Sequence, residues 1–134
     1  MIPIPLGTSR TVVRPLYALI APDSHVPSVE PAWTQTAAYV LVSVGLGARL
    51  TQTLYVMEAG GRGAGHTHDD EHFYYVVEGT CAVNGHELKA GGFAYIPAGG
   101  TFDITSKSGA RVLLFAKKYE VLPGAAAPEV IFGD

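Results

Sequence analysis

The sequence predicts an all-β fold, a sandwich or barrel of short strands joined by tight turns. The chain of 134 residues contains 16 glycines and 9 prolines, and so many turn-forming residues favour short strands over long helices. No segment of ten residues repeats apolar side chains with the helical period of about 3.6. Several short segments instead alternate apolar and polar residues, or are rich in β-branched and aromatic ones.

The composition fits one globular domain, because 48% hydrophobic residues in 134 are enough for a single buried core. The net charge of −3 and the absence of a basic stripe argue against a nucleic-acid partner and a polybasic membrane anchor. The single cysteine, Cys81, excludes an internal disulfide. The sequence has no signal-peptide pattern and no apolar run near the roughly 20 residues of a membrane helix. We therefore expect a cytoplasmic protein with no membrane partner.

Three regions are expected along the chain. Residues 1–35 form an N-terminal arm, because several prolines interrupt any regular element there. Within this arm, 12–13 and 16–20 are candidate short strands. The β pattern covers 36–122, and 123–134 has the composition of a tail or linker.

Within the β region, strands alternate with marked turns. Trp33 lies in a turn-like stretch before the first strand, and a glycine-rich loop is expected over 60–65. Asn84-Gly85 is the strongest hairpin signal, since both residues accept positive φ. A short exposed strand is expected at 129–132. The other predicted strands are 39–43, 48–58, 73–77, 80–83, 86–88, 93–96, 102–105 and 111–117.

Three of the five histidines, His66, His68 and His72, lie within seven residues. They share parity, so on an extended chain their side chains point to one face. Three neutral imidazoles are natural ligands of a divalent transition metal and leave positions open for substrate or water. The pattern therefore predicts a metal site, for which zinc, iron, nickel, copper and manganese are all suitable. The alternative is a solvated polar loop, which the neighbouring Asp69 and Asp70 would favour.

Two spaced motifs make the chain resemble the cupin superfamily. The first cupin motif is G-x5-H-x-H-x3/4-E-x6-G, and Gly60, His66, His68, His72 and Gly79 follow this spacing. His72 stands where most cupins have glutamate. The resemblance implies a cupin-type double-stranded β-helix, a jelly-roll barrel.

The second cupin motif, G-x5-P-x-G-x2-H-x3-N, is matched only in its first half, from Gly91 through Pro97. Its usual histidine position holds Phe102 and its asparagine position holds Ser106. The fourth ligand of the common cupin metal site is therefore missing, and Asp103 is the nearest substitute.

From about residue 12 to the end, the chain resembles the N-terminal half of (S)-ureidoglycine aminohydrolases, two-cupin proteins of allantoin catabolism. The segments that carry this resemblance are Trp33, 45–49, 57–61, 75–79, 91–99 and 117–122. The family's chain is about twice as long, and its Mn²⁺ site lies in the second cupin. That site has the spacing of the present histidines, with His66 in a glutamate position. The resemblance implies Mn²⁺ as the cofactor, with Fe²⁺, Zn²⁺ and Ni²⁺ as alternatives.

Further candidate residues surround this predicted site. Glu71 or Asp103 is a candidate base or water-positioning group. Arg49 is a candidate clamp for a substrate carboxylate, although a surface ion pair is the alternative. Side chains that either line a substrate pocket or pack in the core are Gln52, Tyr55, Tyr74, Tyr95 and Phe102.

The resulting hypothesis is a metal-dependent enzyme that acts on a small polar substrate with a carboxylate or ureido group. The family resemblance implies hydrolytic deamination, the release of ammonia from an α-amino carbon. One alternative is an Fe(II) dioxygenase, because a three-histidine set resembles the iron site of thiol dioxygenase cupins. Another is a non-catalytic, ligand-binding or structural cupin. A homodimer is expected, because the N-terminal arm or the strand at 129–132 can cover a sheet edge of a second chain.

Overall fold

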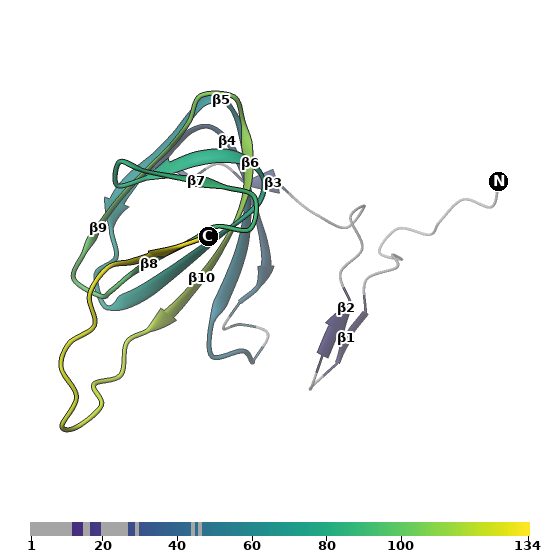
Figure 1. The fold of residues 1–134 in the computed structure, drawn as a ribbon. Helices are drawn as coiled ribbons and strands as arrows, with labels where there is room; N and C mark the ends of the chain where they lie inside the picture. The colour runs from purple at the N-terminus through teal and green to yellow at the C-terminus, as the bar shows by residue number, and fades with distance from the viewer. Residues whose placement is uncertain (1–11, 15–16, 20–26, 29, 44, 46) are drawn as a thin grey trace.

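The computed structural model of the chain is a closed β-barrel with additional strands (Figure 1). It describes residues 12–14, 17–19, 27–28, 30–43, 45 and 47–134. Most of the predicted N-terminal arm lies outside these residues. Two described strands of the arm, β1 (Val12–Arg14) and β2 (Tyr17–Leu19), form an antiparallel pair.

Nine strands form the main sheet, and the described residues contain no α-helix. The described part of the chain accordingly holds no helix that is long and apolar enough to cross a membrane. The strands are β3 (Pro27–Ser28), β4 (Trp33–Val42), β5 (Thr51–His66), β6 (Asp70–Val83), β7 (His86–Lys89), β8 (Phe93–Ile96), β9 (Thr101–Ser106), β10 (Ala110–Lys118) and β11 (Ile131–Gly133).

Two long strands, β5 and β6, close the barrel because each of them pairs at both ends. The first half of β5 and the first half of β6 flank β10, whereas β9 pairs with the second half of β5 and the end of β6. The ring of hydrogen-bonded strands is therefore β5, β10, β6 and β9. β8 and β11 continue the sheet beyond β6, while β4 and β3 continue it beyond β5.

The segment 60–65 is not a loop but part of β5, so the predicted loop is wrong. Trp33, expected in a turn, is the first residue of β4 and lies directly opposite Gly63 of β5. A Cβ atom at Gly63 would lie 2.3 Å from the Trp33 ring, and one at Gly65 would lie 3.1 Å from the Phe102 ring. These glycines are therefore strand residues whose missing side chains leave room for aromatic rings.

Alternation along the strands fixes which side chains enter the barrel. On β9, Phe102, Ile104 and Ser106 are buried, whereas the residues between them are exposed. The largest fully buried side chains in the core are those of Tyr74, Val76, Val83, Leu88, Ile96, Ile104 and Val112.

Two further predicted features, a hairpin and a short strand, are both present in the structure. The Asn84-Gly85 hairpin is confirmed, with φ values of 49° and 81° at its two residues. The strand expected at 129–132 is β11, which pairs with β8 of the same chain.

Candidate functional site

The histidines of the first motif occupy a strand end, a turn and a second strand. His66 is the last residue of β5, and β6 begins at Asp70. His68 lies in the turn between them with a φ of 54°. The expectation of one extended segment with a common face is therefore wrong. His66 and His68 are exposed, and their ring centroids are 5.7 Å apart.

Thr67 lies between these two histidines. Its hydrogen bonds connect the turn after β5 with the 97–100 turn of the second motif. Its buried hydroxyl donates a hydrogen bond to the Pro97 carbonyl at 2.8 Å and accepts one from the Gly100 amide at 2.9 Å. The Thr67 amide donates to the Gly100 carbonyl at 2.9 Å, and the Gly99 amide donates to the His68 carbonyl at 2.7 Å. Hydrogen bonds therefore join the two motifs, which are about thirty residues apart in the chain, at one corner of the barrel. Sequence reasoning missed Thr67 because its partners are backbone groups.

His72 enters the barrel interior, away from the solvent. It is 9% exposed, and its Nδ1 is hydrogen-bonded to the Tyr74 hydroxyl at 2.9 Å. Burial lowers the pKa of the His72 imidazole, while the nearby Asp70 carboxylate acts in the opposite direction. The imidazole is therefore neutral near pH 7.

A second buried tyrosine, Tyr55, is also hydrogen-bonded, in this case to a glutamate. The Tyr55 hydroxyl donates a hydrogen bond to Glu30 Oε2 at 3.0 Å. Burial, with the charge of Glu30, raises the pKa of Tyr55, and burial likewise raises the pKa of Tyr74. Both phenols are protonated at neutral pH. Glu30 was not among the residues predicted for the site, because it lies in the region expected to be an arm.

Three aromatic side chains fill the interior beside His72. Trp33 stacks on Tyr55 with ring centroids 4.0 Å apart and an angle of 13° between the planes. Phe102 lies 6.2 Å from Trp33 and 5.6 Å from the His72 ring. We call Trp33, Tyr55 and Phe102 the aromatic stack. Its three rings come from β4, β5 and β9 and fill the part of the barrel interior that these strands enclose.

The predicted three-histidine metal site does not fit this arrangement. Within the described residues, no three His, Cys, Asp or Glu side chains lie close enough together to hold a metal ion. His66 and His68 approach each other, but His72 does not join them. Phe102, an apolar residue, stands where the second cupin motif places a histidine ligand.

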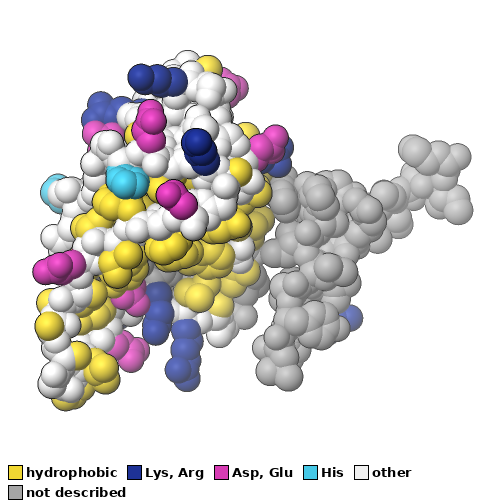
Figure 2. Space-filling model, viewed as in Figure 1, with side chains coloured by type: hydrophobic (Ala, Val, Ile, Leu, Met, Phe, Trp, Pro, Cys, Tyr) yellow, Lys and Arg dark blue, Asp and Glu magenta, His cyan; other side chains and the backbone are white. Residues whose placement is uncertain are grey.

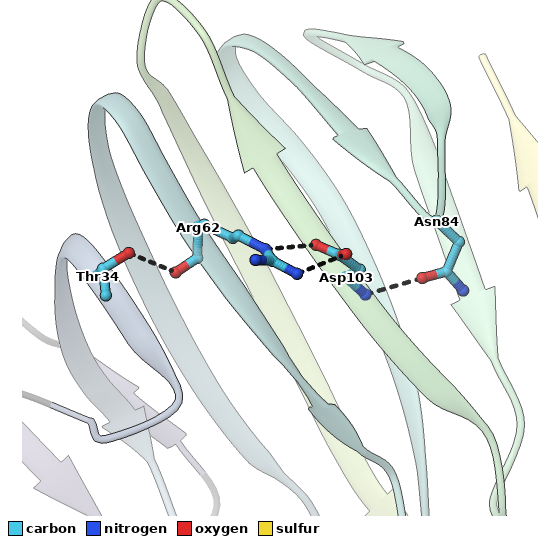
Figure 3. Close-up of polar contacts among 4 residues, drawn as sticks. All are labelled: Thr34, Arg62, Asn84 and Asp103. Carbon is cyan, nitrogen blue, oxygen red and sulfur yellow. Dashed lines mark hydrogen bonds and ion pairs between the residues drawn. The ribbon is translucent and has the colours of Figure 1, made fainter.

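Asp103, a candidate base, forms an ion pair on the outer surface of the barrel (Figure 3). Its carboxylate accepts hydrogen bonds from Arg62 Nε at 3.1 Å and Arg62 Nη2 at 3.0 Å. Its amide donates to Asn84 Oδ1 at 2.8 Å, and Thr34 Oγ1 donates to the Arg62 carbonyl at 3.5 Å. These contacts connect β4, β5, β9 and the β6–β7 turn. Asp103 thus has a structural partner and is not directed towards the interior.

Glu71, the other candidate base, also lies on the outer face. Its Oε2 accepts a hydrogen bond of 2.6 Å from the Tyr95 hydroxyl. Burial and this contact with Glu71 raise the pKa of Tyr95 to about 12. Both residues alternate with the buried His72, Ala94 and Ile96 along their strands, so they face away from the barrel interior.

The remaining predicted residues also divide into those inside the barrel and those nearer its surface. Tyr55, Tyr74 and Phe102 line the interior, as their buried positions require. Gln52 is half-buried opposite Phe115 of β10, and Arg49 is exposed before β5 begins. A cavity of about 620 Å³ lies elsewhere, between the β6–β7 hairpin, the 90–92 turn and the end of β9, and its lining includes none of these residues.

The comparison with protein families agrees with the fold and the two spaced motifs. Residues 53–116 match the family model described as a cupin domain, and the predicted cupin-type barrel is confirmed. The crystal structure of protein Ylba from E. coli superposes with a TM-score of 0.83 at 25% identity. That match covers 94% of this chain and 55% of the Ylba chain.

Two curated plant proteins are similar to nearly the whole chain. The probable (S)-ureidoglycine aminohydrolase of Oryza sativa subsp. japonica is 30% identical, over 96% of this chain and 43% of its own length. The (S)-ureidoglycine aminohydrolase of Arabidopsis thaliana is 29% identical, over 96% of this chain and 44% of its own. The chain thus spans less than half the length of these relatives. It matches one cupin domain of a two-cupin protein, as the sequence predicted.

Proposed function

We propose that this chain is a structural cupin domain of the ureidoglycine aminohydrolase type. In this proposal it supports hydrolytic deamination carried out in another cupin domain and does not perform the reaction itself. The observation that carries the proposal is the aromatic stack of Trp33, Tyr55 and Phe102 inside the barrel.

A metal-centred reaction inside a barrel requires converging ligands and open space for a substrate. The interior beside His72 instead contains Phe102, and Trp33 packs over Gly63, where no larger residue fits. His72 Nδ1 and the Tyr74 hydroxyl are hydrogen-bonded to one another, as buried polar atoms in a stable core usually are. These contacts support packing as the role of the interior.

The proposal is tested by metal content and ammonia release. The untagged protein is incubated with Mn²⁺, desalted and measured by elemental analysis, and ammonia release from (S)-ureidoglycine is assayed in parallel. The Arabidopsis thaliana relative serves as the positive control. We expect no retained manganese and no ammonia above the buffer rate. One manganese per chain together with ammonia release, both lost in His68→Ala, would contradict the proposal.

A second candidate function is metal-dependent hydrolytic deamination within this chain. The observation that favours it is the pair of exposed imidazoles, His66 and His68, with ring centroids 5.7 Å apart. Imidazole nitrogens suit iron, zinc and nickel, and the family resemblance adds manganese to these candidates. The same elemental analysis separates the possibilities. Manganese with ammonia release supports the hydrolase, whereas retained iron with oxygen uptake supports a cupin dioxygenase.

A further inference from the structure

The cavity beside the β6–β7 hairpin is separate from the histidines and from the aromatic stack. Its volume is about 620 Å³, which is in the range of cavities that hold small molecules. Figure 2 shows separate basic and acidic side chains, rather than one patch of a single charge, around the place where β7 lies in Figure 1. The lining of the cavity has the same mixed character, with two lysines, two acidic residues and several apolar ones.

Strand register brings the two lysines to opposite sides of Thr80. Thr80 pairs directly with Lys89 of β7, so the two side chains lie on the same face of the sheet. On its other side, the end of β6 pairs with β9. Continued past the end of β9, this register places Lys107 level with Thr80, whose hydroxyl lies 3.3 Å from that of Ser108. Both lysines and Thr80 line the cavity.

The two ammonium groups are available to an anionic ligand. In the part of the chain that the structure describes, neither Lys89 nor Lys107 forms an ion pair. Neighbouring strands are about 4.8 Å apart, so the two lysine backbones, with β6 between them, are about 10 Å apart. Each ammonium group can therefore hold a different carboxylate, whereas holding one carboxylate together would bring the two positive charges close to each other.

The lining between the lysines is largely apolar. Ala82 lies on the same face of β6 as Thr80, two residues further on, and is half-buried. Leu88 and Ala90 add aliphatic surface from β7 and the turn that follows it. A ligand with a short chain of methylene groups would cover this surface, whereas a compact inorganic anion would leave it in contact with water.

Two acidic residues, Glu87 and Asp134, limit which anions fit. Both line the cavity, and Glu87 lies two residues before Lys89 on the same face of β7, about 7 Å away. Their carboxylates repel anions, so a compact, highly charged anion such as phosphate is disfavoured. A ligand whose two charges lie at its two ends can contact the lysines and keep its middle apolar.

We propose that this cavity binds a short aliphatic dicarboxylate, with one carboxylate on Lys89 and the other on Lys107. The Thr80 hydroxyl, between the lysines, donates a hydrogen bond to one of the carboxylates. The site shares no residue with the histidines or the aromatic stack, so the inference is independent of the proposed function.

Titration of the ¹⁵N-labelled full chain with glutarate, followed by amide NMR spectra at constant pH and ionic strength, tests the proposal. We expect saturable shifts confined to amides around the cavity, within 80–92 and 105–107. The double variant Lys89→Gln/Lys107→Gln should bind at least tenfold more weakly, because both positive charges are lost. Glu87→Gln should bind about two- to threefold more tightly, because a repelling carboxylate is removed.

Two matched controls accompany the titration. Lys117→Gln/Lys118→Gln removes two exposed lysines of β10, outside the cavity, and should leave glutarate binding unchanged. Valerate has the same carbon chain with a single carboxylate and should bind at least fivefold more weakly than glutarate. The absence of saturable shifts at 20 mM glutarate would overturn the proposal. So would valerate or phosphate binding as tightly as glutarate, or a folded Lys89→Gln/Lys107→Gln variant with wild-type affinity.

Discussion

The Trp33 indole lies over Gly63, its direct partner across β4 and β5, where a Cβ atom would come within 2.3 Å of the ring. The two positions therefore depend on one another: the large ring is accommodated because the facing residue has no side chain. Trp33 is 6% exposed and stacks on Tyr55, so the pair sets how the barrel interior is filled.

Gly63→Ala is expected to destabilise the protein by about 1–3 kcal/mol, since overpacking forces the indole or the strands to shift. Urea unfolding followed by tryptophan fluorescence measures this loss. Gly45→Ala is the control, because the nearest atom to a Cβ there is 3.5 Å away. In a Trp33→Ala background the penalty of Gly63→Ala should largely disappear, and an unchanged penalty would argue against the contact.

Asp103→Asn is expected to leave the free energy of unfolding almost unchanged, because the ion pair with Arg62 is exposed on both sides and screened by solvent. The two side chains are 58% and 49% exposed. The loss should shrink further in high salt. A double-mutant cycle with Arg62→Gln, measured by urea unfolding at low and high salt, checks the coupling. A coupling of several kcal/mol would show that the pair does more than connect strands.

His72 is expected to make stability decrease as the pH falls below about 6.5, the unperturbed value for histidine. Its pKa is lower in the folded state than in the unfolded chain, so the unfolded chain binds the proton more readily. The contribution is therefore complete above the unfolded pKa and is lost as the pH falls towards the folded one. Unfolding free energies at pH 7.5, 6.5 and 5.5 should show this slope.

The slope should be smaller in His72→Asn, which keeps a polar partner for Tyr74 but does not titrate. His68→Asn, on the exposed turn, is the matched control and should keep the wild-type slope. Equal slopes in the wild type and His72→Asn would show that other groups govern the pH dependence.

Thr67→Val is expected to cost about 1–3 kcal/mol, because the isosteric change leaves the partly buried Gly100 amide without its hydroxyl acceptor. Thr105→Val, at an exposed position of β9, should change stability by less than about 0.5 kcal/mol. Thermal unfolding compares the two. Proteolysis at the 67–70 turn should also accelerate in Thr67→Val alone, whereas equal rates would mean that the turn is held by backbone contacts only.

Local signals in the sequence were sufficient for most of the fold. Turn residues marked most strand ends, and Asn84-Gly85 formed the expected hairpin. The predicted strands 73–77 and 80–83, however, are parts of the single strand β6. The glycines of 60–65 were misinterpreted, because glycine marks both a loop and a strand position that faces a large ring. Only the cross-strand partner, thirty residues earlier at Trp33, distinguishes the two.

The candidate site was harder to predict for a related reason. Parity places His66, His68 and His72 on one face only if the chain stays extended, and the positive φ of His68 interrupts it. Asp103 was a candidate base because its partner, Arg62, lies 41 residues away and has no local signature. The interior positions of Tyr55, Tyr74 and Phe102, by contrast, follow from strand alternation.

The ring formed by β5, β10, β6 and β9 also bears on how the protein folds. Every seam of this ring joins segments far apart in the chain, because β9 and β10 follow one another in sequence but do not pair. β5 and β6 each take part at both ends of the barrel. Non-local pairing of this kind must overcome the loss of chain entropy before any packing is gained. The barrel should therefore refold slowly for its size, on a timescale of about milliseconds to seconds. Its strands should also lose amide-exchange protection together rather than one after another.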